Sequence, residues 1–171
     1  APMRRTFSCR RVAARSNGNY VVSSWRWDNG GAMDAGAVTF GNGSTGISGA
    51  VTTANSLVGT TDGDLVGSGG VTALTNGNYV VGSPSWDKDG GVTTNVGAVT
   101  FGNGSTGITG AVTEANSLVG SAGGDLVGST GVRALANGNY VVVSTLWDNG
   151  AAMNAGAVTF GYAKARVTRR G

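Results

Sequence analysis

Histidine is absent from this chain, so Asp and Glu must carry most of any acid–base or metal chemistry. Without histidine there is no Ser-His-Asp or Cys-His pair, no imidazole base near neutral pH and no His-bound zinc. The single cysteine, Cys9, cannot form an internal disulfide. Nine Asp and Glu residues remain for acid–base catalysis or for binding a hard cation through oxygen.

A tryptophan followed by an aspartate recurs three times. The pairs are Trp27–Asp28, Trp86–Asp87 and Trp147–Asp148. One interpretation is a repeated ligand-binding platform, in which the indole stacks on a sugar ring and the carboxylate accepts hydrogen bonds from the sugar hydroxyls. The other is packing between neighbouring repeats, since large aromatic side chains bury most area where sheets meet. We favour packing and keep the six residues as candidates for ligand binding.

Asp87 and Asp89 form an Asp-x-Asp-Gly pattern that could bind a metal ion. The equivalent loops read Asp-Asn-Gly, at residues 28–30 and 148–150, so an Asx turn is the favoured alternative. Asp64 and Asp125 each lie in Gly-Asp-Leu-Val-Gly and are expected to cap turns. We predict no catalytic residue and no cofactor, with calcium possible but not favoured.

These residues follow an internal repeat of about 61 residues. Asn-Gly-Asn-Tyr-Val-Val begins at Asn17, Asn76 and Asn137, and Gly-Ala-Val-Thr-Phe-Gly begins at residues 36, 97 and 156. Such self-similarity predicts a repeat architecture. We divide the chain into a basic N-terminal segment (1–15) that could complete a repeat, tandem repeats (16–75, 76–136 and a partial 137–161) and a basic C-terminal tail (162–171).

The pattern inside one repeat is all-β. Short runs such as Tyr79–Ser83 and Gly97–Phe101 are bounded by Gly, Asn, Asp or Ser. Asn76-Gly77 predicts a tight hairpin between residues 71–74 and 79–83. We predict a β-propeller of four-stranded blades, about three per chain, with eleven strands, or twelve if Phe7 to Cys9 contributes one. A β-solenoid is the alternative, although its coils usually repeat at shorter periods.

A family resemblance rests on four segments. They are Gly-Asp-Leu-Val-Gly-Ser at 124–129, Asn-Gly-Asn-Tyr-Val-Val at 137–142, Val-Val-Gly-Ser-Pro at 80–84 and Gly-Ala-Val-Thr-Phe at 97–101. Together they resemble the FG-GAP blade of integrin-alpha-type propellers, and the tandem repeats of large bacterial surface or haemagglutinin-like proteins. The resemblance implies an adhesin-like, secreted or cell-surface protein that binds carbohydrate or protein.

FG-GAP blades often hold calcium in an Asp-x-Asp-x-Asp-Gly hairpin loop. The corresponding loop here reads Leu-Thr-Asn-Gly-Asn-Tyr at 74–79 and has no carboxylate. Useful calcium affinity usually needs several charged oxygen ligands. Calcium is therefore not carried over from the resemblance.

Charge divides the chain into basic ends and an acidic middle. Nine of the twelve basic residues lie at the two ends, whereas residues 28–148 hold all nine acidic ones. A basic tail can hold nucleic acid through its phosphates, but no aromatic residues for base stacking are interleaved, so nucleic acid is not favoured as a partner. No run of about 18 apolar residues predicts a membrane span, and no apolar segment of a signal peptide follows the N-terminal arginines.

Both ends depart from the repeat. One hypothesis is a piece of a longer array whose ends were cut or read in another frame, and the other is ordinary caps. Closed propellers usually have about four to eight blades. We therefore expect two copies to form a six-bladed ring, the N-terminal strand of one completing the last blade of the other, with an open fragment as the alternative.

The predicted function is a non-enzymatic module that binds surface carbohydrate or protein. One alternative is a glycoside or ester hydrolase, with a carboxylate pair in the central channel of the ring. Another is a purely structural repeat fragment.

Overall fold

The computed structural model describes residues 11–14 and 18–163, and its regular structure consists of strands and one short 3₁₀ turn, η1 (Asp89–Gly91). The predicted all-β class is confirmed. In this part of the chain no helix is long and apolar enough to span a membrane. The predicted strand at Phe7 to Cys9 lies outside the described residues.

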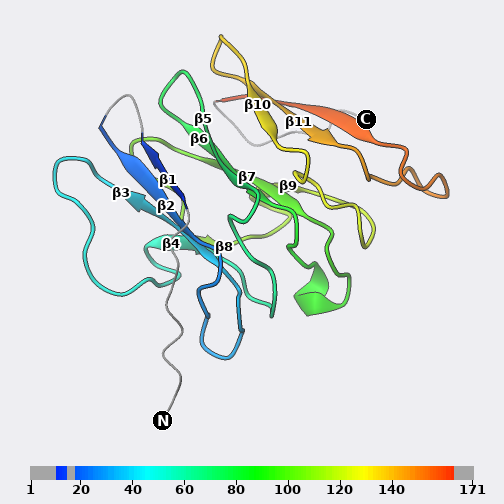
Figure 1. Cartoon of the computed structure of the whole chain (residues 1–171), viewed down its shortest axis with the longest axis horizontal. Coiled ribbons are helices and arrows are strands. Elements are labelled where there is room, and N and C mark those ends of the chain that lie inside the picture. Colours follow the sequence, from blue (N-terminus) through cyan, green and yellow to red (C-terminus); the bar gives the residue numbers. More distant parts are fainter. Residues whose placement is uncertain (1–10, 15–17, 164–171) are drawn as a thin grey trace.

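The strands form three sheets that lie side by side (Figure 1). The first sheet has the order β1 (Arg11–Ala14), β2 (Tyr20–Ser24), β3 (Ala37–Gly41), β4 (Ser56–Val58), β8 (Gly110–Ala111). The second has the order β5 (Gly70–Ala73), β6 (Tyr79–Ser83), β7 (Ala98–Gly102), β9 (Ser117–Val119). The third has the order β10 (Val132–Ala134), β11 (Tyr140–Ser144), β12 (Ala157–Gly161). The described sheets do not close into a ring.

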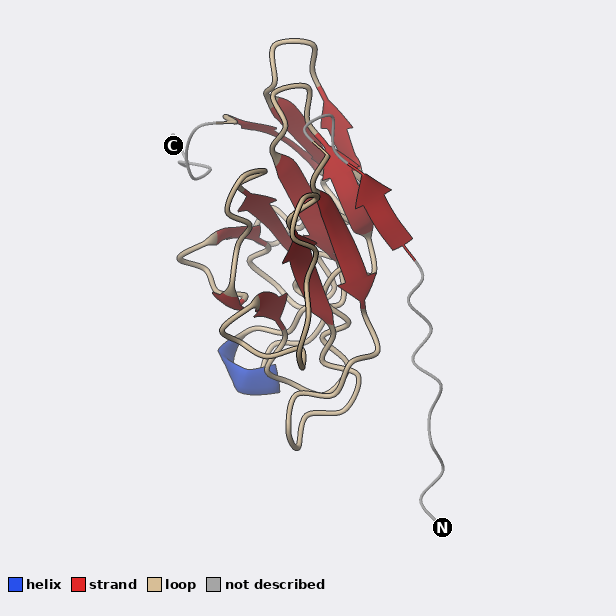
Figure 2. Cartoon of the chain, turned by 90° about the vertical axis from the view of Figure 1, so that its left-hand side faces the viewer, coloured by secondary structure: helices blue, strands red, loops and turns tan. Residues whose placement is uncertain are grey.

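Within each sheet, strands that follow one another in the chain pair antiparallel. The exception is β8, which comes from the second repeat and pairs parallel with β4 of the first, Leu57 facing Gly110 and Val58 facing Ala111. The strand axes are roughly aligned with one another, and most of the longer loops, with η1, lie at one end of the strands (Figure 2). The first strands of the three sheets, β1, β5 and β10, lie next to one another.

The hairpin predicted around Asn76-Gly77 is confirmed. β5 and β6 pair with Ala73 facing Tyr79, and the Leu74 N–H donates to the Asn78 carbonyl at 2.9 Å. Gly77 has φ 84°, a left-handed conformation that glycine adopts without strain. Because the Asn-Gly-Asn marker follows the first strand of each sheet, β5 and β10 precede our repeat boundaries at residues 76 and 137.

A tyrosine lies across a glycine in every sheet. The facing pairs are Tyr20 with Gly41, Tyr79 with Gly102 and Tyr140 with Gly161. A Cβ atom on any of the three glycines would overlap the tyrosine ring, so the ring covers the bare backbone. Tyr79 and Tyr140 are fully buried, and burial raises the pKa of Tyr140 to about 12.

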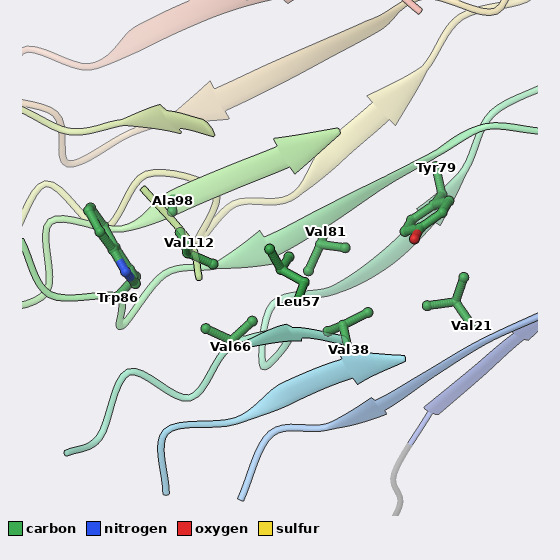
Figure 3. Packing of buried hydrophobic residues seen from close by; sticks show 9 residues of the cluster. All are labelled: Val21, Val38, Leu57, Val66, Tyr79, Val81, Trp86, Ala98 and Val112. Atoms are coloured by element: carbon green, nitrogen blue, oxygen red, sulfur yellow. The ribbon is translucent and has the colours of Figure 1, made fainter. Parts of the chain in front are cut away.

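The apolar core lies between adjacent sheets, and each of its two clusters combines side chains from two sheets. Between the first and second sheets, Val21 and Val38 pack with Tyr79, Val81 and other buried side chains (Figure 3). A second cluster, which includes Val99, Val127 and Val142, joins the second sheet to the third. Each repeat thus needs a neighbour to bury its apolar side chains, as expected for repeat proteins.

Candidate functional site

The Trp–Asp pairs begin three equivalent loops, which we call the Trp–Asp loops (27–36, 86–97 and 147–156). They connect β2 to β3, β6 to β7 and β11 to β12, and all three emerge at the same side of the sheets (Figure 1). Since β2, β6 and β11 are equivalent strands of adjacent sheets, the loops form a row. The fold therefore brings the six candidate residues to one side of the molecule, one pair per repeat.

Each aspartate of these pairs holds its own loop in shape. Asp28 Oδ1 accepts a hydrogen bond from the Asp34 N–H at 2.8 Å, Asp87 Oδ1 from Asn95 at 2.6 Å, and Asp148 Oδ1 from Asn154 at 2.6 Å. The three donor residues have φ between 50° and 53°, a conformation that Asp and Asn tolerate better than most side chains. These bonds span six to eight residues, so they hold the loop backbone together but are not Asx turns.

The three tryptophans differ in exposure because their neighbours differ. Trp86 is only 5% exposed and belongs to the cluster between the first and second sheets (Figure 3). Trp147 is half-buried and packs against the cluster between the second and third sheets. Trp27 is also half-buried. These positions support packing at Trp86 and Trp147, and Trp86 has no free ring face for a sugar.

Asp64 and Asp125 are fully buried, and their turn-capping role is confirmed. Asp64 Oδ2 accepts hydrogen bonds from the Thr60 and Thr61 N–H groups at 2.8 and 2.9 Å. Its Oδ1 accepts a third from the Asp87 N–H at 2.9 Å. Sequence reasoning missed this third bond, which fastens the segment before β5 to the Trp–Asp loop between β6 and β7.

Asp125 makes the same contacts one repeat later. Its Oδ2 accepts bonds from the Ser121 N–H, the Ala122 N–H and the Ser121 hydroxyl, and its Oδ1 accepts one from Asp148 N–H at 3.0 Å. The exact recurrence of Asp64 and Asp125 in Gly-Asp-Leu-Val-Gly was the only sequence signal for this link.

The two buried carboxyls nevertheless titrate differently. Burial raises the pKa of Asp64, outweighing its three hydrogen bonds. Burial acts in the same direction on Asp125, but the hydrogen bonds outweigh it, so the pKa of Asp125 lies below its usual value. Asp125 also has the extra Ser121 hydroxyl, and the third sheet beside it has one strand fewer, so less protein surrounds it.

A second link between repeats, also missed from sequence, uses the last asparagine of Asn-Gly-Asn. Asn19 Nδ2 donates to the Gly104 carbonyl of the next repeat at 2.9 Å, while its Oδ1 accepts from Gly43 N–H of its own repeat. Asn78 likewise donates to the Ala163 carbonyl at 3.2 Å and accepts from Gly104 N–H. The Asn-Gly-Asn hairpin loop thus joins repeats.

Each Trp–Asp loop also exposes one large apolar side chain. Met33 is 60% exposed, Val92 82% and Met153 78%. In the first loop the Arg26 guanidinium lies 4.4 Å from the Trp25 ring centre and 3.9 Å from the Asp34 carboxylate. The loops therefore combine a fixed backbone with an exposed apolar contact.

The possible metal pair, Asp87 and Asp89, is in the second Trp–Asp loop. Asp87 Oδ1 already accepts the Asn95 N–H, and Asp89 lies in the 3₁₀ turn with φ 55°. Across residues 11–14 and 18–163 no three His, Cys, Asp or Glu side chains are grouped so that they could hold a metal ion.

Comparison with known proteins identifies the repeat but no activity. A family model described as "Repeat of unknown function (DUF5650)" matches residues 14–68, 73–129 and 134–169. Each match begins at the last residue of a sheet's first strand (β1, β5 or β10) and continues through the following strands of the chain, so β8 of the first sheet lies in the second match. No curated protein matches the chain.

Proposed function

This chain belongs to the DUF5650 repeats, and from its geometry we propose that it is a non-enzymatic binding module whose Trp–Asp loops contact a protein surface. The observation that carries the proposal is the row of three loops with the same hydrogen-bonded frame, each exposing one large apolar side chain. A loop backbone that is already held in shape loses less conformational entropy on binding a protein surface. Methionine is enriched in such interfaces.

The arrangement of the sheets favours a propeller type of array over a solenoid. Each sheet is largely antiparallel, its first strand lies near the first strands of the other sheets, and the core lies between adjacent sheets. Radially repeated antiparallel sheets have this pattern. The FG-GAP resemblance, with the surface location that it implies, is part of the same proposal.

The engagement of the carboxylates supports a non-enzymatic role. Asp28, Asp87 and Asp148 each accept a backbone N–H of their own loop, and Asp64 and Asp125 are buried under three or four hydrogen bonds. A catalytic carboxylate pair would instead face a common space with its oxygens available to substrate.

Carbohydrate is the second candidate ligand, favoured by the first repeat. Trp27 is half-buried beside the exposed Asp28, so part of an indole and a carboxylate lie together at the surface. Such a pair can stack on a sugar ring and bind its hydroxyls.

The test uses peptides selected from a random phage-displayed library against the unmodified chain. Their affinities are then measured on Met33→Ser, Val92→Ser and Met153→Ser, singly and together, with Ile47→Ser as an exposed control outside the loops. The proposal predicts a loss of about threefold to tenfold for each single change, near-complete loss for the triple variant and no change for the control. Selected peptides that bind the triple variant as tightly as the unmodified chain would contradict it.

The same variants, together with Trp27→Ala, are tested by affinity electrophoresis in gels containing soluble dextran, xylan or glycol chitin. Retardation that is lost with Trp27→Ala but kept in the triple loop variant would favour carbohydrate instead.

A further inference from the structure

The third strand has the same sequence in all three sheets, but its surroundings differ in the last sheet. β3, β7 and β12 all read Ala-Val-Thr-Phe-Gly. β3 and β7 lie between two strands, whereas β12 pairs, among the described residues, only with β11. Val38 and Val99 are 1% exposed, but the equivalent Val158 is 74% exposed. An apolar strand edge of this kind readily pairs with a further strand.

The Trp–Asp loops show the same contrast at their C-terminal ends. In the first repeat, the carbonyls of residues 33–35 accept hydrogen bonds from the N–H groups of Gly63, Leu65 and Val66 at 2.9 to 3.1 Å. In the second repeat, the carbonyls of residues 94–96 accept equivalent bonds from residues 124, 126 and 127. No described residue donates to the carbonyls of residues 153–155 in the third repeat.

The glycine before each third strand measures how closely this segment docks. A Cβ atom on Gly36 or Gly97 would overlap the backbone nitrogen of Val66 or Val127. On Gly156, the same atom would meet nothing nearer than the Thr145 carbonyl oxygen at 3.5 Å. Gly156 has φ 75°, close to the 80° and 77° of its equivalents, so the third repeat keeps the docking geometry.

We propose that β12 and residues 153–156 bind an extended segment of the type Asn-Ser-Leu-Val-Gly followed by Gly-Asp-Leu-Val-Gly, of the kind that a further repeat supplies. The inference rests on the proposed propeller-type array. Both segments of this type in the chain, residues 55–67 and 116–128, already fill the equivalent edges of the first and second repeats. A further segment of the same type is therefore the occupant that fits the third edge.

The register follows from the filled edges. In the first sheet Thr39 faces Ser56 with their hydroxyl oxygens 2.7 Å apart, and Thr100 and Ser117 repeat this contact in the second. In the bound segment the serine therefore faces Thr159, the leucine faces Val158 and the valine faces Ala157. The leucine covers the exposed Val158, and the glycine-rich second half accounts for the room around Gly156.

The experiment uses a fluorescein-labelled peptide with the sequence of residues 116–128 and measures its anisotropy as the full chain is added. Saturable binding is expected. Val158→Lys, which changes an exposed side chain, should weaken binding at least about tenfold, because docking would bury an unpaired ammonium. Ile47→Lys, a change at an exposed side chain away from this edge and outside the Trp–Asp loops, should leave the affinity within about twofold. A peptide with lysine in place of Leu118, the leucine that should face Val158, should bind the unmodified chain as weakly as the unmodified peptide binds Val158→Lys.

The inference would be overturned if the peptide showed no saturable binding at chain concentrations up to about 1 mM. It would also be overturned if Val158→Lys and the unmodified chain bound the peptide with equal affinity. A chain dimer, detected by light scattering, that Val158→Lys dissociates would overturn it as well, because a part of the second copy other than these two engaged segments would then occupy the edge. The Trp–Asp loop variants separate the two proposals. If the 116–128 peptide does not bind but the selected ligands still depend on the Trp–Asp loops, this inference alone is contradicted. If the peptide binds but no ligand depends on the loops, only the proposed function is contradicted.

Discussion

The outer edges of the first two sheets show what a neighbouring repeat contributes. At β4 of the first sheet, the second repeat supplies β8, which pairs with Leu57 and Val58, and both side chains are fully buried. At β9 of the second sheet, the equivalent residues Leu118 and Val119 are only half-buried. A hollow of about 380 Å³ lies there instead, lined by residues 117–121 and by the Lys88–Glu114 ion pair.

Equivalent positions with the same residues thus differ in burial according to what the next repeat supplies. The fold is therefore stabilised by the contacts between repeats rather than by each sheet alone. Substitutions at equivalent positions should therefore change the free energy of unfolding by different amounts. The loss should be largest where the contacts between repeats are most complete.

The largest contrast is expected at the docking glycines. Gly97→Ala would place a methyl group into the Val127 backbone and should destabilise the fold by at least about 3 kcal/mol. Gly156→Ala keeps the same φ penalty but meets no backbone, so it should cost only about 1 kcal/mol. Urea unfolding followed by tryptophan fluorescence measures both, and equal losses would contradict the open geometry of the third repeat.

Third-strand valines should give the next largest difference. Val99→Ala removes two methyl groups from a buried site, at a cost of about 2 kcal/mol. Val158→Ala changes an exposed side chain and should stay within about 0.5 kcal/mol. Thermal unfolding by circular dichroism separates the two variants, and a cost at Val158 that matches Val99 would show a covered edge.

The buried aspartates should differ in pH dependence. Asp64→Asn and Asp125→Asn each remove one acceptor oxygen and should cost about 1 to 3 kcal/mol. Because the pKa of Asp125 is lowered on folding, its stabilisation is present above the ordinary value of 3.8 and is lost as the pH falls through the folded pKa. Because the pKa of Asp64 is raised, its stabilisation is full below 3.8 and declines as the pH rises through the folded pKa.

Unfolding free energies measured between pH 3 and pH 7 test this opposition. Relative to the unmodified chain, the loss in Asp125→Asn should grow as the pH rises, whereas the loss in Asp64→Asn should shrink. Parallel pH profiles for the two variants would show that the aspartates titrate alike.

The smallest contrast is expected at the asparagine links. Asn78→Ala removes a hydrogen bond to its own repeat and one to the next, and should cost about 2 kcal/mol. The Asn139 side-chain oxygen accepts the Ala163 N–H of its own repeat. Its side-chain nitrogen, Nδ2, donates no hydrogen bond to another described residue. Asn139→Ala should therefore cost about half as much. Differential scanning calorimetry resolves the difference, and an equal cost would remove this link from the account.

Local sequence predicted the features that depend on neighbouring residues. The hairpin at Asn76-Gly77, the strand Tyr79–Ser83 and the turn-capping by Asp64 follow from turn chemistry and alternation within a few positions. Asp64 also bonds to Asp87, 23 residues away, and that contact depends on how two repeats pack.

The exposure of Val158 could not be predicted from its surroundings in the chain, because Val38 and Val99 have the same flanking residues. The Trp–Asp pairs were recognised by recurrence, but whether their rings pack or bind depends on the neighbouring sheet. The identity of a ligand stays a prediction for the same reason, since the loop geometry fixes the contact surface and not its partner.

Amide hydrogen exchange by NMR tests the central claim most directly, because one chain contains the strand Ala-Val-Thr-Phe-Gly three times. The amides of β3 and β7 that face β4 and β9 should exchange slowly, whereas the amides of β12 that face away from β11 should exchange orders of magnitude faster. Addition of the 116–128 peptide should slow only the β12 set. Equal protection of all three strands in the chain alone would contradict the account, since β12 would then already be paired.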